Sequence, residues 1–317
     1  MLQYLILQLC DTSVSYCHYG ISHKDVRLMP LSVLEQAVLW AMKENLSVQV
    51  VYPDYEIPRE YKEVIDRVDH TDIVSSRSNL KDTADVVVIS DWDELQGFCF
   101  RKETAYVLRT TLEKFYHRYE ELKPVLEAVS RLNVVFLDVV QFADADIEKY
   151  RKALTFLAKE VESIYAQGGQ VQLNLLTDRM MLDKMNNCGA GETNVTLAPD
   201  GKFYVCPAFY NESNGFNVGN MQHGLDVKNA QLYKLDHAPI CRHCDAYHCK
   251  RCVWMNRETT LEVNTPSHEQ CVMAHLERNA SRQLLEAIRK HGTFLPEQKA
   301  ITEIDYLDPF EKRKEWQ

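Results

Sequence analysis

The stretch that decides how the last third of this chain folds is Cys241-Arg242-His243-Cys244-Asp245-Ala246-Tyr247-His248-Cys249-Lys250-Arg251-Cys252. It contains two C-x2-C pairs separated by four residues. A two-residue spacer lets both sulfurs of a pair turn toward one metal ion or cluster. Because a cysteine-dense segment with few large apolar residues gains most of its folding free energy from metal, this stretch predicts a small metal-dependent module.

Further cysteines flank this stretch in the same part of the chain. Seven of the ten cysteines fall after residue 187, and those outside the stretch are Cys188, Cys206 and Cys271. The others are scattered over the first 187 residues, at Cys10, Cys17 and Cys99. Closely spaced thiolates without a cation repel one another and oxidise, so the seven clustered cysteines predict bound metal rather than free thiols.

The metal itself is left as two alternatives. Cys241, Cys244, Cys249 and Cys252 by themselves match one structural zinc site, in which His243, His248 or His268 could also substitute as ligands. One zinc ion does not explain the other three cysteines of the module. Ligand number and softness therefore favour iron-sulfur clusters, with zinc as the alternative.

The first 185 residues alternate short apolar runs with segments of helical spacing. The predicted strands are Tyr4 to Leu9, Ser47 to Tyr52, Ile73 to Ser75, Asp85 to Ser90, Asn133 to Asp138 and Gln170 to Leu175. The predicted helices are Leu31 to Glu44, Arg59 to Val68, Glu103 to Arg131 and Ile147 to Gln167. Parallel strands need a long crossover, which a helix supplies, so the pattern predicts an α/β fold, a partial β/α barrel over residues 1–185.

The pattern changes at residue 186. Val195 to Ala198 and Lys202 to Val205 flank the turn Pro199-Asp200-Gly201 and predict a β-hairpin. A helix from Cys271 to Arg289 is expected to close a cysteine-rich domain over residues 186–291. Residues 292–317 are polar and are expected to form a loosely packed C-terminal extension. Asp91 and Asp138 follow predicted strands, where a helix-capping or loop role is favoured over chemistry.

Composition excludes several classes of protein. The net charge of -10 offers no broad basic field for phosphates, so no nucleic-acid partner is expected. No apolar run approaches the roughly 20 residues that span a bilayer, and Met1 to Leu9 lacks the basic leader of a signal peptide. With clustered cysteines and no export signal, the expected location is the reducing cytoplasm.

The cysteine spacing resembles the SPASM signature of peptide-modifying radical SAM enzymes. That signature begins C-x(9 to 15)-G-x4-C, which Cys188, Gly201 and Cys206 match. Its centre is C-x2-C-x5-C-x3-C, and two spacers here are each one residue shorter.

The resemblance implies two [4Fe-4S] clusters and assigns a role to each of the seven cysteines. The outer cluster would be held by Cys241, Cys244, Cys249 and Cys271, and the inner cluster by Cys188, Cys206 and Cys252. Three ligands leave one inner iron open to a substrate thiolate, a water or a side chain such as Glu192.

The radical SAM half of this layout departs from its usual pattern. Radical SAM enzymes carry C-x3-C-x2-C after the first strand, whereas this chain has only Cys10 and Cys17 there, with six residues between them. The chain thus resembles a pseudo-radical SAM protein. It is similar over most of its length to the CXXX repeat peptide maturase family, on the stretches Asp11 to Tyr19, Ala41 to Leu46 and Val51 to Tyr55.

This resemblance implies a function. The expected partner is a ribosomally made precursor peptide with cysteine at every fourth position, bound and oriented at the SPASM clusters for maturation. Ordinary radical SAM chemistry is not expected without the triad. Two alternatives stay open: a non-catalytic peptide adaptor or electron carrier for a separate modifying enzyme, and a zinc-stabilised interaction protein.

Overall fold

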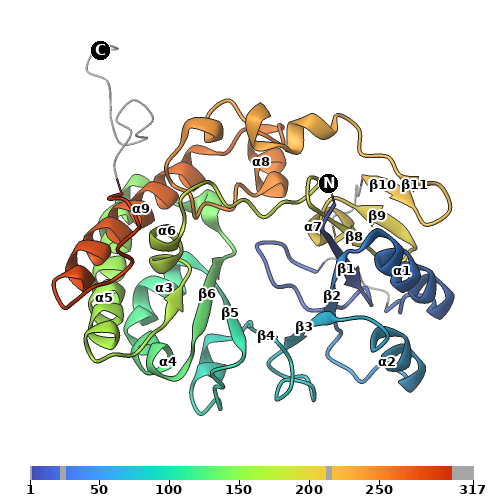
Figure 1. Cartoon of the computed structure of the whole chain (residues 1–317), viewed down its shortest axis with the longest axis horizontal. Coiled ribbons are helices and arrows are strands. Elements are labelled where there is room, and N and C mark those ends of the chain that lie inside the picture. Colours follow the sequence, from blue (N-terminus) through green and yellow to red (C-terminus); the bar gives the residue numbers. More distant parts are fainter. Residues whose placement is uncertain (1, 22–25, 212–215, 302–317) are drawn as a thin grey trace. The chain divides into compact units, whose positions relative to one another are not determined.

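Strands and helices alternate along most of the chain, and the strands run largely parallel (Figure 1). The computed structural model describes residues 2–21, 26–211 and 216–301. The alternation confirms the predicted α/β class. No helix in these three ranges is both long enough and apolar enough to cross a bilayer.

Two compact units make up the chain. One unit comprises residues 1–94 and 189–234, and the other comprises residues 95–188 and 235–317. Each unit is therefore built from two separate segments. The domain boundaries expected after residues 185 and 291 stay predictions.

The first unit contains one sheet in the strand order β11-β10-β9-β8-β1-β2-β3-β4. Its strands are β1 (Tyr4–Gln8), β2 (Ser47–Val51), β3 (His70–Ser75), β4 (Val86–Ile89), β8 (Asn194–Leu197), β9 (Lys202–Tyr204), β10 (Asn217–Asn220) and β11 (Gly224–Leu225). Its helices are α1 (Leu31–Glu44), α2 (Arg59–Ile65) and α7 (Pro207–Asn211). From β8 to β4 all neighbours are parallel, and β8 to β11 are antiparallel.

The predicted helix Leu31 to Glu44 is confirmed as α1. Its buried residues are spaced three or four apart, at Leu34, Ala37, Val38 and Ala41. This spacing places them on one face of the helix. The helix ends at Asn45, whose φ of 53° lies in the left-handed region that asparagine tolerates better than most residues.

The predicted hairpin is also confirmed. β8 and β9 pair antiparallel, with Thr196 opposite Tyr204. Gly201 has a φ of +76° in the connecting turn, where a side chain would be strained. The sequence did not predict that β8 also pairs in parallel with β1, which makes the hairpin part of the unit's main sheet.

The second unit contains the parallel strands β5-β6-β7 and six helices. The strands are β5 (Ala105–Thr110), β6 (Arg131–Phe136) and β7 (Gln172–Leu173). The α-helices among the described residues of this unit are α3 (Leu112–Arg118), α4 (Leu122–Ala128), α5 (Ile147–Ala166), α6 (Thr177–Met181), α8 (Val253–Thr260) and α9 (His268–Arg289).

The single helix predicted from Glu103 to Arg131 is wrong. This segment holds β5, α3 and α4 in succession. Leu112, Phe115, Leu122 and Val125 are buried at helical spacing and masked the six-residue strand before them. The strand is central, since Tyr106 and Leu108 are at most 1% exposed.

The closing helix is confirmed as α9, which begins slightly earlier than predicted, at His268. Ser267 caps it by accepting a hydrogen bond from the backbone N–H of Gln270. The apolar face predicted for it is buried, at Leu276, Leu284, Leu285 and Ile288. α9 packs along α5, and the Tyr150 hydroxyl of α5 donates a hydrogen bond to Glu277 of α9.

The start of the predicted C-terminal extension, residues 292–301, contacts the end of α9 at a few points. Arg289 donates hydrogen bonds to the carbonyl oxygens of Phe294, Leu295 and Gln298. Ile301 is 4% exposed. Most side chains of residues 292–300 are exposed, so the expected loosely packed extension stays a prediction, and residues 302–317 lie outside the described part of the chain.

Candidate metal centre

A small enclosed cavity of about 30 Å³ lies in the second unit, and four cysteines line it. These are the four assigned above to the outer cluster: Cys241, Cys244, Cys249 and Cys271. The first three come from the segment that runs from a 3₁₀ turn (Cys241–His243) to α8, and the fourth comes from the first turn of α9. Cys252 does not line the cavity, although it belongs to the second C-x2-C pair.

The sulfurs lie close enough to influence one another's ionisation. Burial raises the pKa of Cys241 to about 11 and that of Cys271 to about 12. The pKa of Cys249 is also raised, first by burial and then by the neighbouring cysteines. Four neighbouring thiols, of which Cys241 is buried and the others are partly exposed, oppose each other's deprotonation, so they need a cation to become thiolates together.

Backbone N–H groups point at two of these sulfurs. The N–H of Ala246 donates a hydrogen bond to Cys244 Sγ over 3.4 Å. The N–H of Arg251 hydrogen-bonds to Cys249, where Arg251 adopts a left-handed φ of 45°. Donors aimed at buried sulfurs suit thiolates bound to metal, so these residues fit a thiolate-ligated centre.

Positive charge surrounds the cysteine loop. The Arg251 guanidinium, buried at 3% exposure, lowers the pKa of Cys241 and so partly offsets the effect of burial. Arg278 of α9 is fully buried, and its Nη1 lies 2.6 Å from Asp245 Oδ1. Arg179 Nε donates to the carbonyl oxygen of Asp245 over 2.6 Å. A centre of four thiolates is anionic, and buried arginines compensate such charge.

The histidines near the cysteine stretch are not the ones that reach the cavity. His243 and His268 are absent from its lining, and His248 is hydrogen-bonded to Glu277 over 2.9 Å. His275 lines the cavity instead, and sequence reasoning missed it. The sequence could have indicated His275 by its position, because it follows Cys271 by four residues on a predicted helix and both side chains then lie on one face.

The cysteines assigned to the inner cluster are divided between the units. Cys188 and Cys252 belong to the second unit, and Cys206 belongs to the first, between β9 and α7. The backbone N–H of Cys188 donates to the carbonyl oxygen of Lys250 over 3.2 Å, which places Cys188 beside the cysteine stretch. Metal binding by these three cysteines stays a prediction.

The loop after β1, where the radical SAM triad would stand, is closed by hydrogen bonds. Cys10 is fully buried, and the Tyr55 hydroxyl donates to its sulfur over 3.2 Å. Asp11 is fully buried and accepts hydrogen bonds from the Tyr210 hydroxyl and the Arg27 backbone N–H. Tyr210 lies on α7, which begins directly after Cys206, so Cys206 and this loop are held to one another within the first unit.

Asp138 and Asp91 take local structural roles. Both carboxylate oxygens of Asp138 accept hydrogen bonds from the backbone N–H of Leu112, the first residue of α3. Asp91 accepts a hydrogen bond from the Asp93 backbone N–H, at the start of a 3₁₀ turn. These contacts fit the expected helix-capping or loop role of Asp138 and Asp91, although the N-cap residue of α3 is Thr111.

Neither a protein-family model nor a curated protein matches the chain. Solved structures do match it. A structure of tagged anSMEcpe with bound AdoMet has a TM-score of 0.62 at 14% identity, and the match covers 97% of each chain. "Native anSMEcpe with bound AdoMet and Cp18Cys peptide" has a TM-score of 0.60 at 14% identity, over 92% of this chain and 100% of the other. The chain therefore has a radical-SAM-like fold.

Proposed function

We propose that this chain is a peptide maturation protein that binds a cysteine-rich precursor peptide beside two iron-sulfur clusters. The observation that carries the proposal is the cavity lined by Cys241, Cys244, Cys249 and Cys271. This set takes its fourth sulfur from α9 and excludes Cys252.

This division of cysteines supports iron-sulfur clusters over a single zinc ion. A lone zinc knuckle would use Cys241, Cys244, Cys249 and Cys252, the four adjacent in sequence. If Cys271 completes the outer set, Cys252 is left for a second centre with Cys188 and Cys206. Such clusters, when bound, can exchange single electrons and coordinate an added thiolate.

A peptide partner is supported by two independent likenesses. Two of the similar structures were solved with a bound peptide, Cp18Cys in one and Kp18Cys in the other. The resemblance to CXXX repeat maturases supports a precursor with cysteine at every fourth position. Side chains four residues apart lie along one face of a helix, so one docking surface could engage successive cysteines.

The loop after β1 bears on whether this chain cleaves SAM itself or only binds the peptide. Cys10 and Cys17 are too few for a cluster triad, and Cys10 is hydrogen-bonded to Tyr55 and Thr12. These contacts support a chain that binds and orients the peptide without cleaving SAM itself. They equally suit the second candidate, an adaptor or electron carrier for a separate modifying enzyme.

The test is a spectroscopic titration of the anaerobically purified, iron-loaded protein. A peptide of Cys-x3 repeats should change the visible absorption of the clusters, because a vacant iron favours thiolate over water. A matched peptide with alanine in place of every cysteine should leave it unchanged. A colourless protein that contains zinc and no iron or sulfide would contradict the proposal. Equal responses to both peptides would contradict thiolate coordination.

A further inference from the structure

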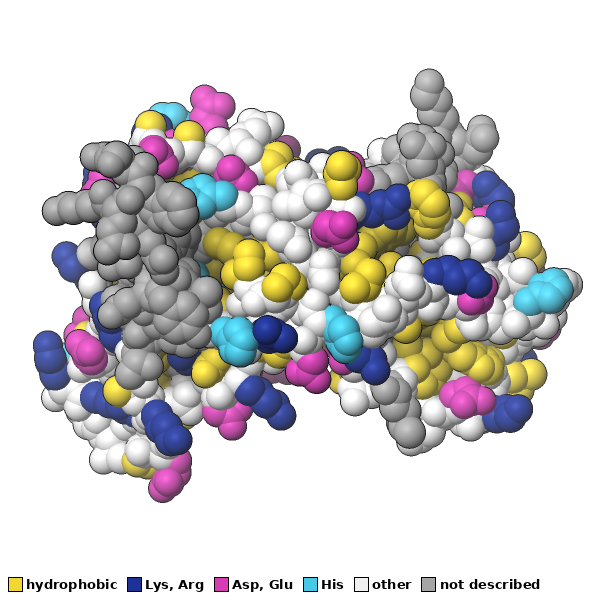
Figure 2. All heavy atoms as spheres, turned by 90° about the horizontal axis from the view of Figure 1, so that it is seen from above, with side chains coloured by type: hydrophobic (Ala, Val, Ile, Leu, Met, Phe, Trp, Pro, Cys, Tyr) yellow, Lys and Arg dark blue, Asp and Glu magenta, His cyan; other side chains and the backbone are white. Residues whose placement is uncertain are grey.

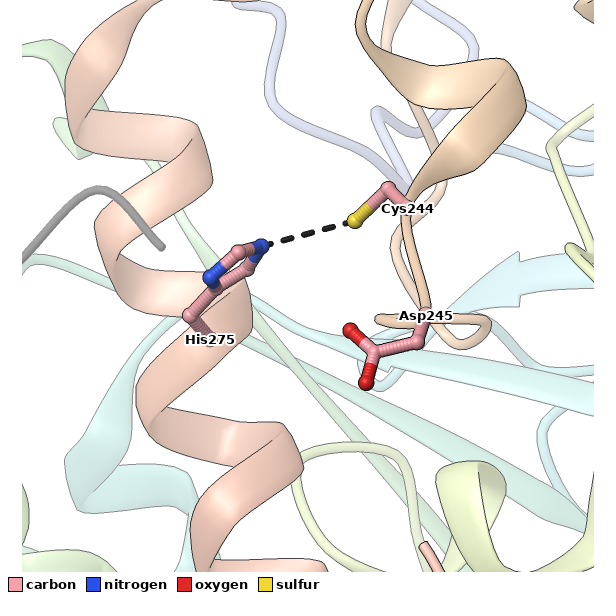
Figure 3. A group of neighbouring side chains, drawn as sticks. All are labelled: Cys244, Asp245 and His275. Atoms are coloured by element: carbon pink, nitrogen blue, oxygen red, sulfur yellow. Dashed lines mark hydrogen bonds between the residues drawn. The ribbon is translucent and has the colours of Figure 1, made fainter. Parts of the chain in front are cut away.

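His275 is the one side chain among the described cavity-lining residues that places a ring nitrogen against a cysteine sulfur. Its Nε2 lies 3.4 Å from Cys244 Sγ (Figure 3). The side chain is 3% exposed, and α9 holds it one helical turn beyond Cys271. The imidazole is therefore shielded from water, while Cys244 is partly exposed, and the helix that supplies a proposed ligand also fixes the position of His275.

The direction of this hydrogen bond depends on whether metal is bound. A metal-bound thiolate has no proton to give, so the sulfur of Cys244 can only accept. His275 must then donate through Nε2–H, which fixes its neutral tautomer with the proton on Nε2. The Ala246 backbone N–H is a second donor to the same sulfur. Cys244 thus receives two N–H groups, one of them from a side chain that can be exchanged.

A separate metal site at this position has less support. Cys244, Asp245 and His275 each place one ligand atom within 4.8 Å of the others, and Figure 3 shows all three side chains grouped together. The Asp245 carboxylate, however, is already neutralised by Arg278 at 2.6 Å. Cys244 lines the cavity with the other cysteines. A hydrogen-bonding role for His275 uses these contacts without a third ligand.

We infer that His275 sets the reduction potential of the centre held by Cys241, Cys244, Cys249 and Cys271. This inference rests on the proposed function in requiring that the centre be an iron-sulfur cluster. One-electron reduction adds a negative charge to the cluster and its sulfurs. An N–H donor on a ligating sulfur stabilises that added charge and raises the potential, and burial strengthens the effect. His275 acts through Cys244, so it is a positioning residue.

The experiment compares variants by anaerobic redox titration with dithionite, which supplies the single electron without making or breaking a bond in the protein. His275→Phe keeps most of the side-chain volume and removes the donor. At a fixed potential it should lower the reduced-to-oxidised ratio of the outer centre about tenfold, which is about 59 mV for a one-electron couple. His275→Gln keeps an N–H donor and should restore most of the potential.

The controls separate this inference from the proposed function. His291→Phe makes the same change at an exposed histidine just after α9 and should leave the potential as it is in the unaltered protein. Iron and sulfide content report whether each variant still holds its clusters. Unchanged potentials in His275→Phe with full iron content would overturn the role of His275 alone. Zinc without iron in the unaltered protein would overturn both proposals. If the His275→Phe protein loses its iron, His275→Met, which also lacks an N–H donor, decides: a drop of about tenfold in the reduced-to-oxidised ratio supports the role of His275, and an unchanged potential overturns it.

Discussion

At the scale of single residues, the ligand set depends on which cysteine supplies the fourth sulfur. Cys249 and Cys252 form a C-x2-C pair, but the left-handed backbone at Arg251 stands between them. Cys249 lines the cavity, and Cys252 forms the N-cap of α8 outside it. Cys271, in the first turn of α9, supplies the fourth sulfur that lines the cavity.

Replacing one cysteine of the proposed outer set and one of the proposed inner set should therefore remove two different clusters. Cys271→Ala should cost about half of the iron and sulfide by abolishing the outer centre, and Cys252→Ala should cost the other half. Cys99→Ala, at an exposed cysteine, is the matched control. Metal analysis of the three purified variants decides the matter. Complete metal loss in Cys252→Ala with none in Cys271→Ala would instead identify a zinc knuckle.

Away from the metal, His70 gives the first unit a pH-dependent contribution. The Asp72 carboxylate, whose Oδ1 lies 3.4 Å from His70 Nε2, is the main cause that raises the pKa of His70 to about 9. A raised pKa in the folded state stabilises the protein fully below the unfolded value of about 6.5, and this stabilisation is lost as pH rises through 9. Allowing for solvent screening, the free energy of unfolding should fall by on the order of 1 kcal/mol across that window.

Urea unfolding at intervals from about pH 6 to 10 measures this decline. His70→Gln cannot take up the proton, so its stability should lack this part of the fall. His223→Gln changes an exposed histidine of the same unit and should behave like the unaltered protein. An identical decline in His70→Gln would show that other groups cause it.

At the scale of elements, the β8–β9 hairpin and the cysteine loop have different sources of stability. β8 is paired with β1 along its length, from Asn194 beside Tyr4 to Leu197 beside Leu7. The loop from Cys241 to Cys252 has no strand partner among the described residues and holds short turns only. The hairpin is stabilised by the sheet, whereas the loop depends on its ligands and its contacts with α9.

Removing metal with a chelator should therefore loosen these elements unequally. Amide hydrogen exchange should rise strongly over residues 241–252 and in the first turn of α9. The amides of β8 and of the strand β2 on the other side of β1 should stay protected, because their ladder bonds do not involve a ligand. Exchange in β8 that rises as much as in the cysteine loop would contradict this account.

At the scale of the whole molecule, the charged side chains and the cysteines are distributed differently along the chain. Lysine, arginine and acidic side chains are interspersed on the face in Figure 2, without a broad field of one sign. The seven clustered cysteines fall after residue 187, while the loop after β1 keeps two. The fold is radical-SAM-like, and where the family resemblance implies a C-x3-C-x2-C triad after β1, this chain has Cys10 and Cys17.

The protein should accordingly produce no deoxyadenosine from SAM. Incubated anaerobically with a strong reductant, the iron-loaded chain should stay at background, because two cysteines do not hold the cluster that delivers the electron. A radical SAM enzyme with its triad intact serves as the positive control. A stoichiometric product that disappears in Cys17→Ala would reveal a site completed by an unexpected third ligand.

The sequence by itself determined the features that depend on local spacing. Alternating apolar runs and helical periods predicted most strands and the three longest helices. The resemblance to the SPASM signature grouped the four cysteines that line one cavity apart from Cys188, Cys206 and Cys252. The sequence could not determine features made by residues distant along the chain. The pairing of β8 with β1 joins residues that lie far apart in the sequence. The strand β5 was not predicted because the helical spacing of the residues after it made the whole segment look like one helix. His275 reaches Cys244 only because α9 packs against the cysteine loop, with Arg278 fixed on Asp245. Spacing along a helix says which residues share a face, while tertiary packing decides what that face meets.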